Sequence, residues 1–315
     1  MGKEALVAEA VREAIVKTGL GLEDKVLAVM PRDLKYTAIQ IRSIIESYKN
    51  TDILTISNNL LNIKNIDEII KYITILAYLI GYSRAKAEDI LEAYPREYES
   101  LDGLSAGKLR QFIEKILNNK IDNINNHVNN IIKILNFLKD RKGMYIWILK
   151  QRRVEEFEDE IRRYIFQNDG GYSIDRGVKL FLRLFIDKNS IPLAYKIAYN
   201  EREVRRYRIH GDIYTTLVTL RSGAFEDMRS TTVDKIRQRV AKALICRERG
   251  ERCKNIRIRL RSVRGLVRSV AYLSGDPIAY ERGAYHVGRN YCARLKCDEC
   301  PIRDVCKKYI FINIK

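Results

Sequence analysis

The sequence is poor in the features that make linkers, membrane spans and secretion signals. Only five of its 315 residues are proline and it contains no low-complexity tract, which argues against long disordered segments. Its longest apolar run, near Ile73–Ile80, is too short to cross a bilayer. The N-terminus lacks a signal-like hydrophobic region. We therefore expect an intracellular, cytoplasmic protein with no membrane partner.

Acidic residues are also in deficit. The chain has 58 Lys and Arg against 40 Asp and Glu, which gives a formal net charge of +18. Clustered cations release condensed counterions when they meet phosphates, so this excess favours a nucleic acid as the partner. The alternative is the charged surface of a heat-adapted protein, although such surfaces usually balance the two signs.

Strand-like alternation is scarce, and helical periodicity takes its place. Apolar residues recur at helical spacing in Glu4–Lys17 and again across Pro31–Leu138, which predicts an all-α fold. One short stretch differs, because Arg257, Arg259 and Arg261 alternate with apolar residues. This pattern favours an extended or looped segment that contacts phosphates, or else a plain solvated face.

Cysteine is the residue type with the clearest pattern. Four of the six cysteines fall within fifteen residues, at the spacing C-x4-C-x2-C-x5-C. These candidate metal ligands are Cys292, Cys297, Cys300 and Cys306. Thiolates are soft ligands suited to iron–sulfur clusters and zinc, and we favour a [4Fe-4S] cluster. Structural zinc is the alternative, although its ligands usually come as two separated pairs; a disulfide pair is the third possibility. Cys246 and Cys253 could oxidise together, but in a reducing interior we expect free thiols.

The residues around this cluster suggest a family. The run Asp276–Cys292, followed by the three remaining cysteines, resembles the end of the endonuclease III superfamily of DNA glycosylases. It departs from the family in one respect, because four residues instead of the usual six separate the first two cysteines. The resemblance implies an all-α fold with helix-hairpin-helix elements and a C-terminal [4Fe-4S] loop. It also implies that the N-terminal helix returns to the iron–sulfur end of the molecule.

On this basis we divide the chain into three parts. Residues 1–140 form an N-terminal helical region, 141–275 a helix-hairpin-helix glycosylase-like core, and 276–315 the iron–sulfur loop region. In the last part, Arg289 and other basic residues of the loop are available for DNA phosphates.

A candidate catalytic carboxylate lies upstream of the cysteines. Asp212, Arg221 and Gly223 fit the superfamily pattern D-x-x-[VT]-x5-R-x-G, in which an aspartate begins a helix. The resemblance implies that Asp212 stabilises the positive charge that develops on the sugar as the C–N bond breaks. The alternative is that Asp212 only caps its helix. The pattern also departs from the family, because Tyr214 replaces a common histidine and the distance to Cys292 is longer than usual.

Two stretches resemble helix-hairpin-helix turns, whose backbone N–H groups can approach a DNA phosphate. Each has a serine where the second glycine of the motif is expected, so a turn closed by a serine N-cap is the alternative for both. The predicted DNA-binding residues are Gly103, Ser105 and Lys108 in the first stretch, and Gly171, Ser173 and Arg176 in the second.

Family members that also cut the strand use a lysine that forms a Schiff base with the sugar. Asp175 or Arg176 occupies the corresponding position here. Lys179, one turn further along, is the candidate nucleophile, and Lys196 and Lys108 are more distant options. A plain surface lysine is the alternative reading of Lys179.

Together these features predict a nucleoid-associated DNA repair enzyme. We expect it to bind damaged double-stranded DNA, flip the damaged base and hydrolyse its N-glycosidic bond, with AP lyase activity as a possible addition. The alternative is a catalytically inactive iron–sulfur protein that binds nucleic acid on the same scaffold. A zinc-stabilised RNA-binding or modification factor is the third hypothesis.

Overall fold

The computed structural model describes residues 3–99, 105–118, 120–140, 144–167, 174–250 and 253–315. These residues are mostly helical, as the sequence predicts. They form two compact units. The terminal unit combines Met1–Leu22 with Tyr207–Lys315, and the central unit is Glu23–Arg206. These units have other boundaries than the predicted division at residues 140 and 275, and that division stays a prediction.

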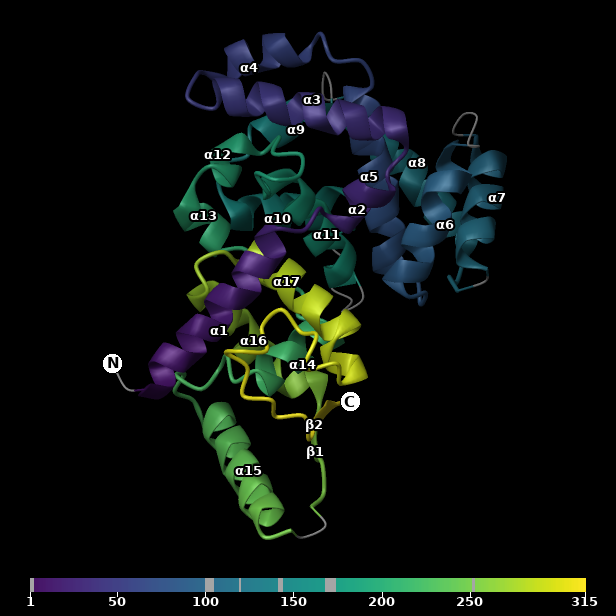
Figure 1. The fold of residues 1–315 in the computed structure, drawn as a ribbon. Helices are drawn as coiled ribbons and strands as arrows, with labels where there is room; N and C mark the ends of the chain where they lie inside the picture. Colours follow the sequence, from purple (N-terminus) through teal and green to yellow (C-terminus); the bar gives the residue numbers. More distant parts are fainter. Residues whose placement is uncertain (1–2, 100–104, 119, 141–143, 168–173, 251–252) are drawn as a thin grey trace. The chain divides into compact units, whose positions relative to one another are not determined.

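The central unit is built around α5 (Ile66–Tyr82), which is buried on nearly every side (Figure 1). The other helices of this unit are α2 (Lys25–Val29), α3 (Arg32–Tyr48), α4 (Ile53–Leu60), α6 (Ala87–Glu99), α7 (Ala106–Leu117), α8 (Ile124–Asp140), α9 (Met144–Leu149), α10 (Val154–Tyr164), α11 (Ile174–Ile186), α12 (Tyr195–Ala198) and α13 (Glu201–Arg205). Helix α11 crosses α5 at Gly177, where an added Cβ would lie 2.2 Å from the carbonyl oxygen of Ala77. This glycine therefore permits a contact that a larger side chain would block.

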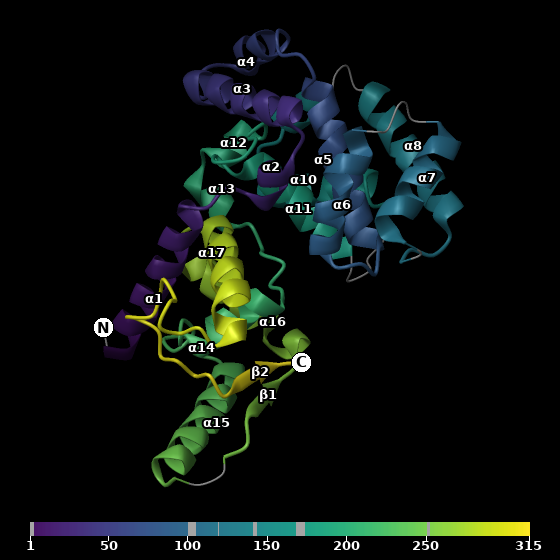
Figure 2. The ribbon, with the colours of Figure 1, turned by 45° about the vertical axis from the view of Figure 1, so that its right-hand side comes forward.

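The terminal unit contains the predicted cysteine ligands and Asp212. Its elements are α1 (Lys3–Leu20), α14 (Ile213–Arg221), α15 (Thr231–Glu248), β1 (Ile256–Ile258), α16 (Leu260–Leu273), α17 (Pro277–Asn290), a 3-10 turn η1 (Cys292–Arg294) and β2 (Ile312–Ile314). Helix α1 packs along α17 (Figure 2). At their crossing, a Cβ on Gly283 would lie 2.0 Å from the carbonyl oxygen of Ile15. The expected return of the N-terminal helix to the cysteine end is thus confirmed.

The strands β1 and β2 pair in parallel, with Ile256 opposite Ile312. The extended segment predicted around Arg257 is confirmed for Ile256–Ile258, whose burial alternates while Arg257 points to solvent. It is shorter than predicted, because α16 begins at Leu260 and takes Arg261 into a helix.

The prediction of free thiols at Cys246 and Cys253 is wrong. The two residues form a disulfide, with their Cα atoms 5.9 Å apart. Cys246 lies in the last turns of α15, and the chain then reverses toward β1, which brings Cys253 back alongside the helix. Local sequence shows that the two cysteines are seven residues apart, but it does not show that the chain turns between them.

No helix in the described part of the chain is both long enough and apolar enough to span a membrane.

Candidate active site and cysteine pocket

Asp212 is the N-cap of α14. Its Oδ1 accepts a hydrogen bond from the backbone N–H of Thr215 at 2.7 Å. Gly211, which precedes it, has φ +67°, a left-handed conformation that glycine adopts without strain. The carboxylate therefore lies at the positive end of the helix, where its charge is favoured. The capping role that the sequence left as an alternative is present, and it does not exclude a role toward the sugar.

A second carboxylate, Glu281 on α17, lies beside this segment. It is 9% exposed. Its two oxygens accept hydrogen bonds from the hydroxyl of Tyr207 at 3.0 Å and from the backbone N–H of His210 at 2.9 Å. Glu281 thus holds the chain that leads into Asp212. Sequence reasoning missed this residue, although a single acid among the apolar positions of the 277–290 run was a usable signal.

Burial and neighbouring charges act on Asp212. Burial raises the pKa of Asp212 above its ordinary value; the hydrogen bond from Thr215 and the nearby His210 oppose the rise, while the charge of Glu281 adds to it. A carboxylate with a raised pKa is a better proton acceptor near neutral pH than an ordinary aspartate.

Basic residues of α16 lie close to the same segment. Arg261, Arg264 and Arg268 are spaced by three and four residues, so they share one face of the helix. Arg268 donates from Nε to the carbonyl oxygen of Ile209 at 3.0 Å. Arg264 packs beside Gly211, where a Cβ would lie 3.8 Å from its Cγ. Arg264 and Arg268 therefore lie against the segment that leads into Asp212, and guanidinium groups are suited to phosphate binding.

The opposite end of α14 holds the C-terminal loop. Arg221 is 6% exposed. It donates to the carbonyl oxygens of Cys292 at 2.7 Å and Ile312 at 2.8 Å, and to Oδ1 of Asn313 at 3.1 Å. Gly223 has φ +83°, and a Cβ there would lie 2.6 Å from the side chain of Lys307. The Arg and Gly of the D-x-x-[VT]-x5-R-x-G pattern thus both serve to seat this loop.

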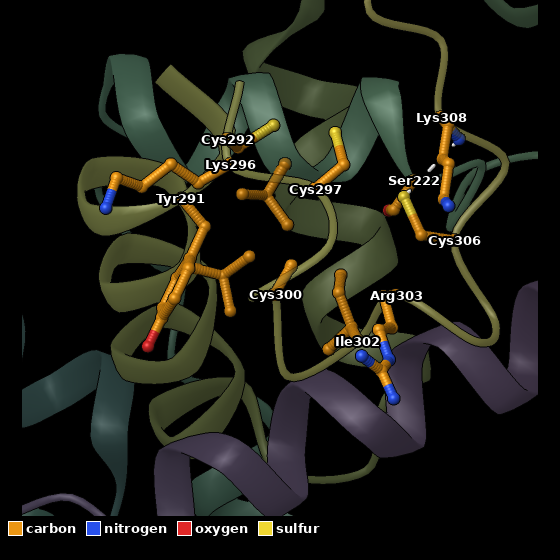
Figure 3. Close-up of a pocket in the computed structure, with 12 residues that line it drawn as sticks. Ser222, Tyr291, Cys292, Lys296, Cys297, Cys300, Ile302, Arg303, Cys306 and Lys308 are labelled. Carbon is orange, nitrogen blue, oxygen red and sulfur yellow. Dashed lines mark hydrogen bonds between the residues drawn. The ribbon is translucent and has the colours of Figure 1, made fainter. Parts of the chain in front are cut away.

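All four clustered cysteines line one pocket, together with residues that include Val218, Ser222 and Ile302 (Figure 3). None of these four cysteines is in a disulfide. Two of the sulfur atoms accept hydrogen bonds. Arg221 Nη1 donates to Cys292 Sγ at 3.9 Å, and the backbone N–H of Lys308 donates to Cys306 Sγ at 3.4 Å. Such donors stabilise thiolate ligands, so the donor set fits a thiolate-bound centre.

The geometry of the pocket does not by itself define a metal site. Among the described residues, no three His, Cys, Asp or Glu side chains are arranged to hold a metal ion. Burial raises the pKa of Cys292 to about 11, and it also raises the pKa values of Cys300 and Cys306. The four thiols share a pocket, and their ligation of a cluster stays a prediction.

The predicted hairpin residues have different surroundings. Gly103, Gly171 and Ser173 lie outside the described residues. Ser105 caps α7, because its hydroxyl accepts from the backbone N–H of Lys108 at 3.4 Å, which is the capping alternative; both residues are exposed.

The two predicted arginine contacts are engaged within their own units. Arg176 donates to the carbonyl oxygens of Ser83 at 2.9 Å and Ala85 at 3.4 Å, beyond the C-terminus of α5. Arg289 donates to the hydroxyl of Tyr285 at 3.3 Å. A role of either arginine in DNA contact stays a prediction.

Lys179 is not a surface lysine, so that alternative is wrong. It is 3% exposed, and its Nζ lies 2.5 Å from Oε2 of Glu158. Glu158 also pairs with Arg162 at 2.7 Å, which pairs in turn with Asp175 at 2.6 Å. Burial lowers the pKa of Lys179, against the opposing charge of Glu158. A lysine nucleophile needs such a lowered pKa, but it also needs access, which this buried pair denies.

No family model, no curated protein and no solved structure matches the chain.

Proposed function

We propose that this protein binds double-stranded DNA and hydrolyses the N-glycosidic bond of a damaged base. The observation that carries the proposal is the construction of α14. Asp212 caps its first turn, and Arg221 in its last turn holds the backbone of Cys292. One helix of nine residues therefore joins the two features that resemble the endonuclease III superfamily, and it does so within one compact unit.

The chemistry assigns a role to each group near Asp212. The base must leave the stack before its glycosidic bond is accessible. As the bond from C1′ to the base nitrogen breaks, its electron pair leaves with the base and positive charge develops on the sugar. The Asp212 carboxylate stabilises this charge and accepts a proton from the water whose oxygen bonds to C1′. Glu281 keeps Asp212 in place through His210, and the arginines of α16 bind flanking phosphates.

The cysteine pocket would hold the inorganic centre. Cys292, Cys297, Cys300 and Cys306 are the candidate ligands of a [4Fe-4S] cluster, and zinc suits the same thiolates. When bound, this centre supplies structural order to the loop. Arg221 and the backbone N–H of Lys308 orient two of the ligands from outside.

A second candidate function is binding without catalysis. It is favoured by the burial of Lys179 against Glu158 and by the use of Asp212 as a cap, since both groups have a structural task already. On this alternative the scaffold grips DNA and cuts no base. Lyase chemistry at Lys179 requires that the pair with Glu158 opens when DNA binds.

The deciding experiment is a lesion panel. The purified protein is incubated with duplexes that carry uracil, 8-oxoguanine or an oxidised pyrimidine, and abasic sites are detected by alkaline cleavage. Excision of one lesion that is lost in Asp212→Asn supports the proposal. Tight, salt-sensitive binding without excision of any lesion supports the silent binder instead.

A further inference from the structure

The segment between α14 and α16 forms a hairpin that the superfamily resemblance does not account for. It consists of α15 and β1, residues 231–258, which we term the arm. Figures 1 and 2 both show α15 extending away from α14, α16 and α17. Its 18 residues correspond to about 27 Å of helix. A helix of this length that protrudes from its own unit presents much of its surface to a partner.

The two faces of α15 differ in chemistry. Val233, Ile236, Val240 and Ala243 are its buried residues. Lys235, Arg239 and Lys242 recur at i, i+4 and i+7, so they form one row on a face of the helix separate from the buried one, and Arg249, the C-cap residue, follows this row. All four are exposed. The apolar face thus holds the arm to its unit, and the cationic row faces solvent.

No acid in the described part of the arm forms an ion pair with the cationic row. The described part of the arm has two acids, Asp234 and Glu248, and Asp234 pairs with Arg237, outside the row, at 3.3 Å. Arg239 donates from Nη2 to the carbonyl oxygen of Arg257 at 3.1 Å, a bond to a neutral group. The adjoining β1 adds the exposed Arg257. Exposed cations in a row match the regular charges of a nucleic-acid backbone.

The row leads toward the candidate active site. After β1 the chain enters α16, where Arg261, Arg264 and Arg268 share one face. Arg264 and Arg268 then lie against Gly211 and the carbonyl oxygen of Ile209, directly before Asp212. Cations therefore continue from the arm to the segment that precedes Asp212, within a single unit.

The base of the arm is fixed. Ser230 caps α15 by accepting from the backbone N–H of Val233 at 3.2 Å, and Arg237 donates to the carbonyl oxygen of Met228 at 3.1 Å. At the other end of the helix, the disulfide joins Cys246 to Cys253. A fixed arm loses less conformational entropy on binding than a flexible basic loop.

We infer that the arm binds the phosphate backbone of duplex DNA, and so extends the footprint of the protein along the duplex. Lys235, Arg239, Lys242 and Arg249 are the contacting residues. The contact is independent of sequence, because it uses phosphates and no base edges. The inference rests on the DNA-binding part of the proposed function and not on its catalytic part.

The test measures binding to an undamaged duplex by the full-length protein over a series of salt concentrations. The variant Lys235→Gln/Arg239→Gln/Lys242→Gln removes three cations of the row. Each phosphate contact contributes about 0.9 to the slope of log Kobs against log salt, so the slope is expected to fall by about 2 to 3. The control Lys64→Gln/Lys133→Gln/Lys139→Gln removes three exposed cations of the central unit and is expected to keep the wild-type slope.

A charge-preserving variant separates charge from folding. The variant Lys235→Arg/Arg239→Lys/Lys242→Arg is expected to retain the wild-type slope. A reduced slope in this variant would overturn the inference. Equal slopes for the glutamine variant and the wild type would also overturn it, while leaving the proposed function in place. If the wild-type protein bound no duplex, both the inference and the proposed function would be overturned. Stronger wild-type binding to single-stranded RNA of the same length would overturn the assignment to duplex DNA.

Discussion

Arg221 donates a hydrogen bond from Nη1 to the backbone carbonyl oxygen of Cys292 at 2.7 Å. The same guanidinium reaches Ile312, so it joins the start of the cysteine loop to the strand that ends the chain. Because Arg221 ends the helix that Asp212 begins, one helix connects the cysteine loop to the candidate carboxylate. The distance between the candidate carboxylate and the cysteine pocket is thus set by the length of a helix.

Replacing Arg221 should therefore release the loop. Arg221→Ala leaves the carbonyl oxygens of Cys292 and Ile312 without this partner, and we expect a loss of about 3 kcal/mol in the free energy of unfolding. Chemical denaturation monitored by circular dichroism measures it. The control is Arg229→Ala, an exposed arginine of the same unit, which should change stability by less than about 0.5 kcal/mol. Equal effects of the two substitutions would contradict the role of Arg221.

The metal prediction is tested by the two classes of cysteine in the terminal unit. Protein purified without oxygen should be brown and contain iron and sulfide, and Cys300→Ser should lower its iron content, because a thiolate ligand is lost. The variant Cys246→Ser/Cys253→Ser removes the same kind of atom from the disulfide and should retain full iron content. A colourless protein that holds zinc in the wild type but not in Cys300→Ser would identify zinc as the metal.

Asp212 can be tested without removing its cap. Asparagine caps a helix about as well as aspartate, so Asp212→Asn should change stability by less than about 1 kcal/mol while excision falls by about 10² to 10³. The matched control is Asp52→Asn, because Asp52 caps α4 of the central unit in the same way. That variant should keep wild-type excision. Retained activity in Asp212→Asn would remove the carboxylate from the mechanism.

The raised pKa of Asp212 gives the same variant a signature in pH. A carboxyl group whose pKa is higher in the folded state stabilises the protein below its unfolded pKa, and this contribution is lost as pH rises through the folded pKa. The asparagine in Asp212→Asn does not titrate. As pH rises from the unfolded pKa to the folded pKa of Asp212, the wild type loses this contribution, so the stability of the variant relative to the wild type should increase. Above the folded pKa the difference should stay constant. Excision, which requires the ionised form, should increase over the same interval. Thermal melting and single-turnover rates at each pH measure the two curves.

Local patterns in the sequence predicted part of the secondary structure. The helical periods of Glu4–Lys17 and the alternation at Arg257 appear as α1 and β1, because neighbouring residues decide such features. The return of the N-terminal helix to the cysteine end was expected only through the family resemblance. Gly19 and Gly283 show why α1 packs on α17, because both helices lack side chains where their backbones meet. Nothing local signals a contact between residues that lie so far apart in sequence.

The sites were predicted to different depths. The spacing of the four cysteines predicted the ligands of one metal centre; the four side chains line one pocket, and their ligation of a metal stays a prediction. The pattern at Asp212 located a helix N-terminus correctly, whereas Glu281 was missed because its partners come from another helix and from the chain before it. Lys179 was interpreted from its position in a motif. Its burial depends on Glu158, which no motif connects to it.

Two different substitutions of Lys179 separate its structural role from a role in lyase chemistry. Lys179→Met leaves Glu158 buried without its closest cation, and we expect a loss of about 3 kcal/mol or more. Lys179→Arg keeps a positive charge there but cannot form an imine, so it should retain more stability and yet abolish borohydride trapping to DNA if Lys179 is the nucleophile. Trapping that persists in Lys179→Arg would assign the imine to another lysine, and Lys196 and Lys108 are the next variants to test.

Glu158 adds a pH dependence to this pair. Burial alone would raise its pKa, but Lys179 and Arg162 together hold the pKa of this carboxyl below its ordinary value. A lowered pKa stabilises the folded state above the unfolded pKa, and that contribution is lost as pH falls through the folded pKa. Wild-type stability should therefore decline in acid, and Glu158→Gln should decline less over the same interval. Parallel curves for the two proteins would contradict this.

The disulfide makes a prediction about the arm. Closing a short loop by a disulfide stabilises the folded chain by about 2 kcal/mol, and here the loop spans the end of α15 and the approach to β1. The variant Cys246→Ser/Cys253→Ser should increase amide hydrogen exchange in the last turns of α15, with little change in α14 or α17, since their packing does not involve the bridge.

Alkylation tests whether the bridge is present. The unfolded, metal-free wild type without reductant should be labelled at four cysteines, and labelling of all six would show that the bridge is absent. A fixed arm should also bind duplex more tightly than an unbridged one, because less order is imposed when the complex forms.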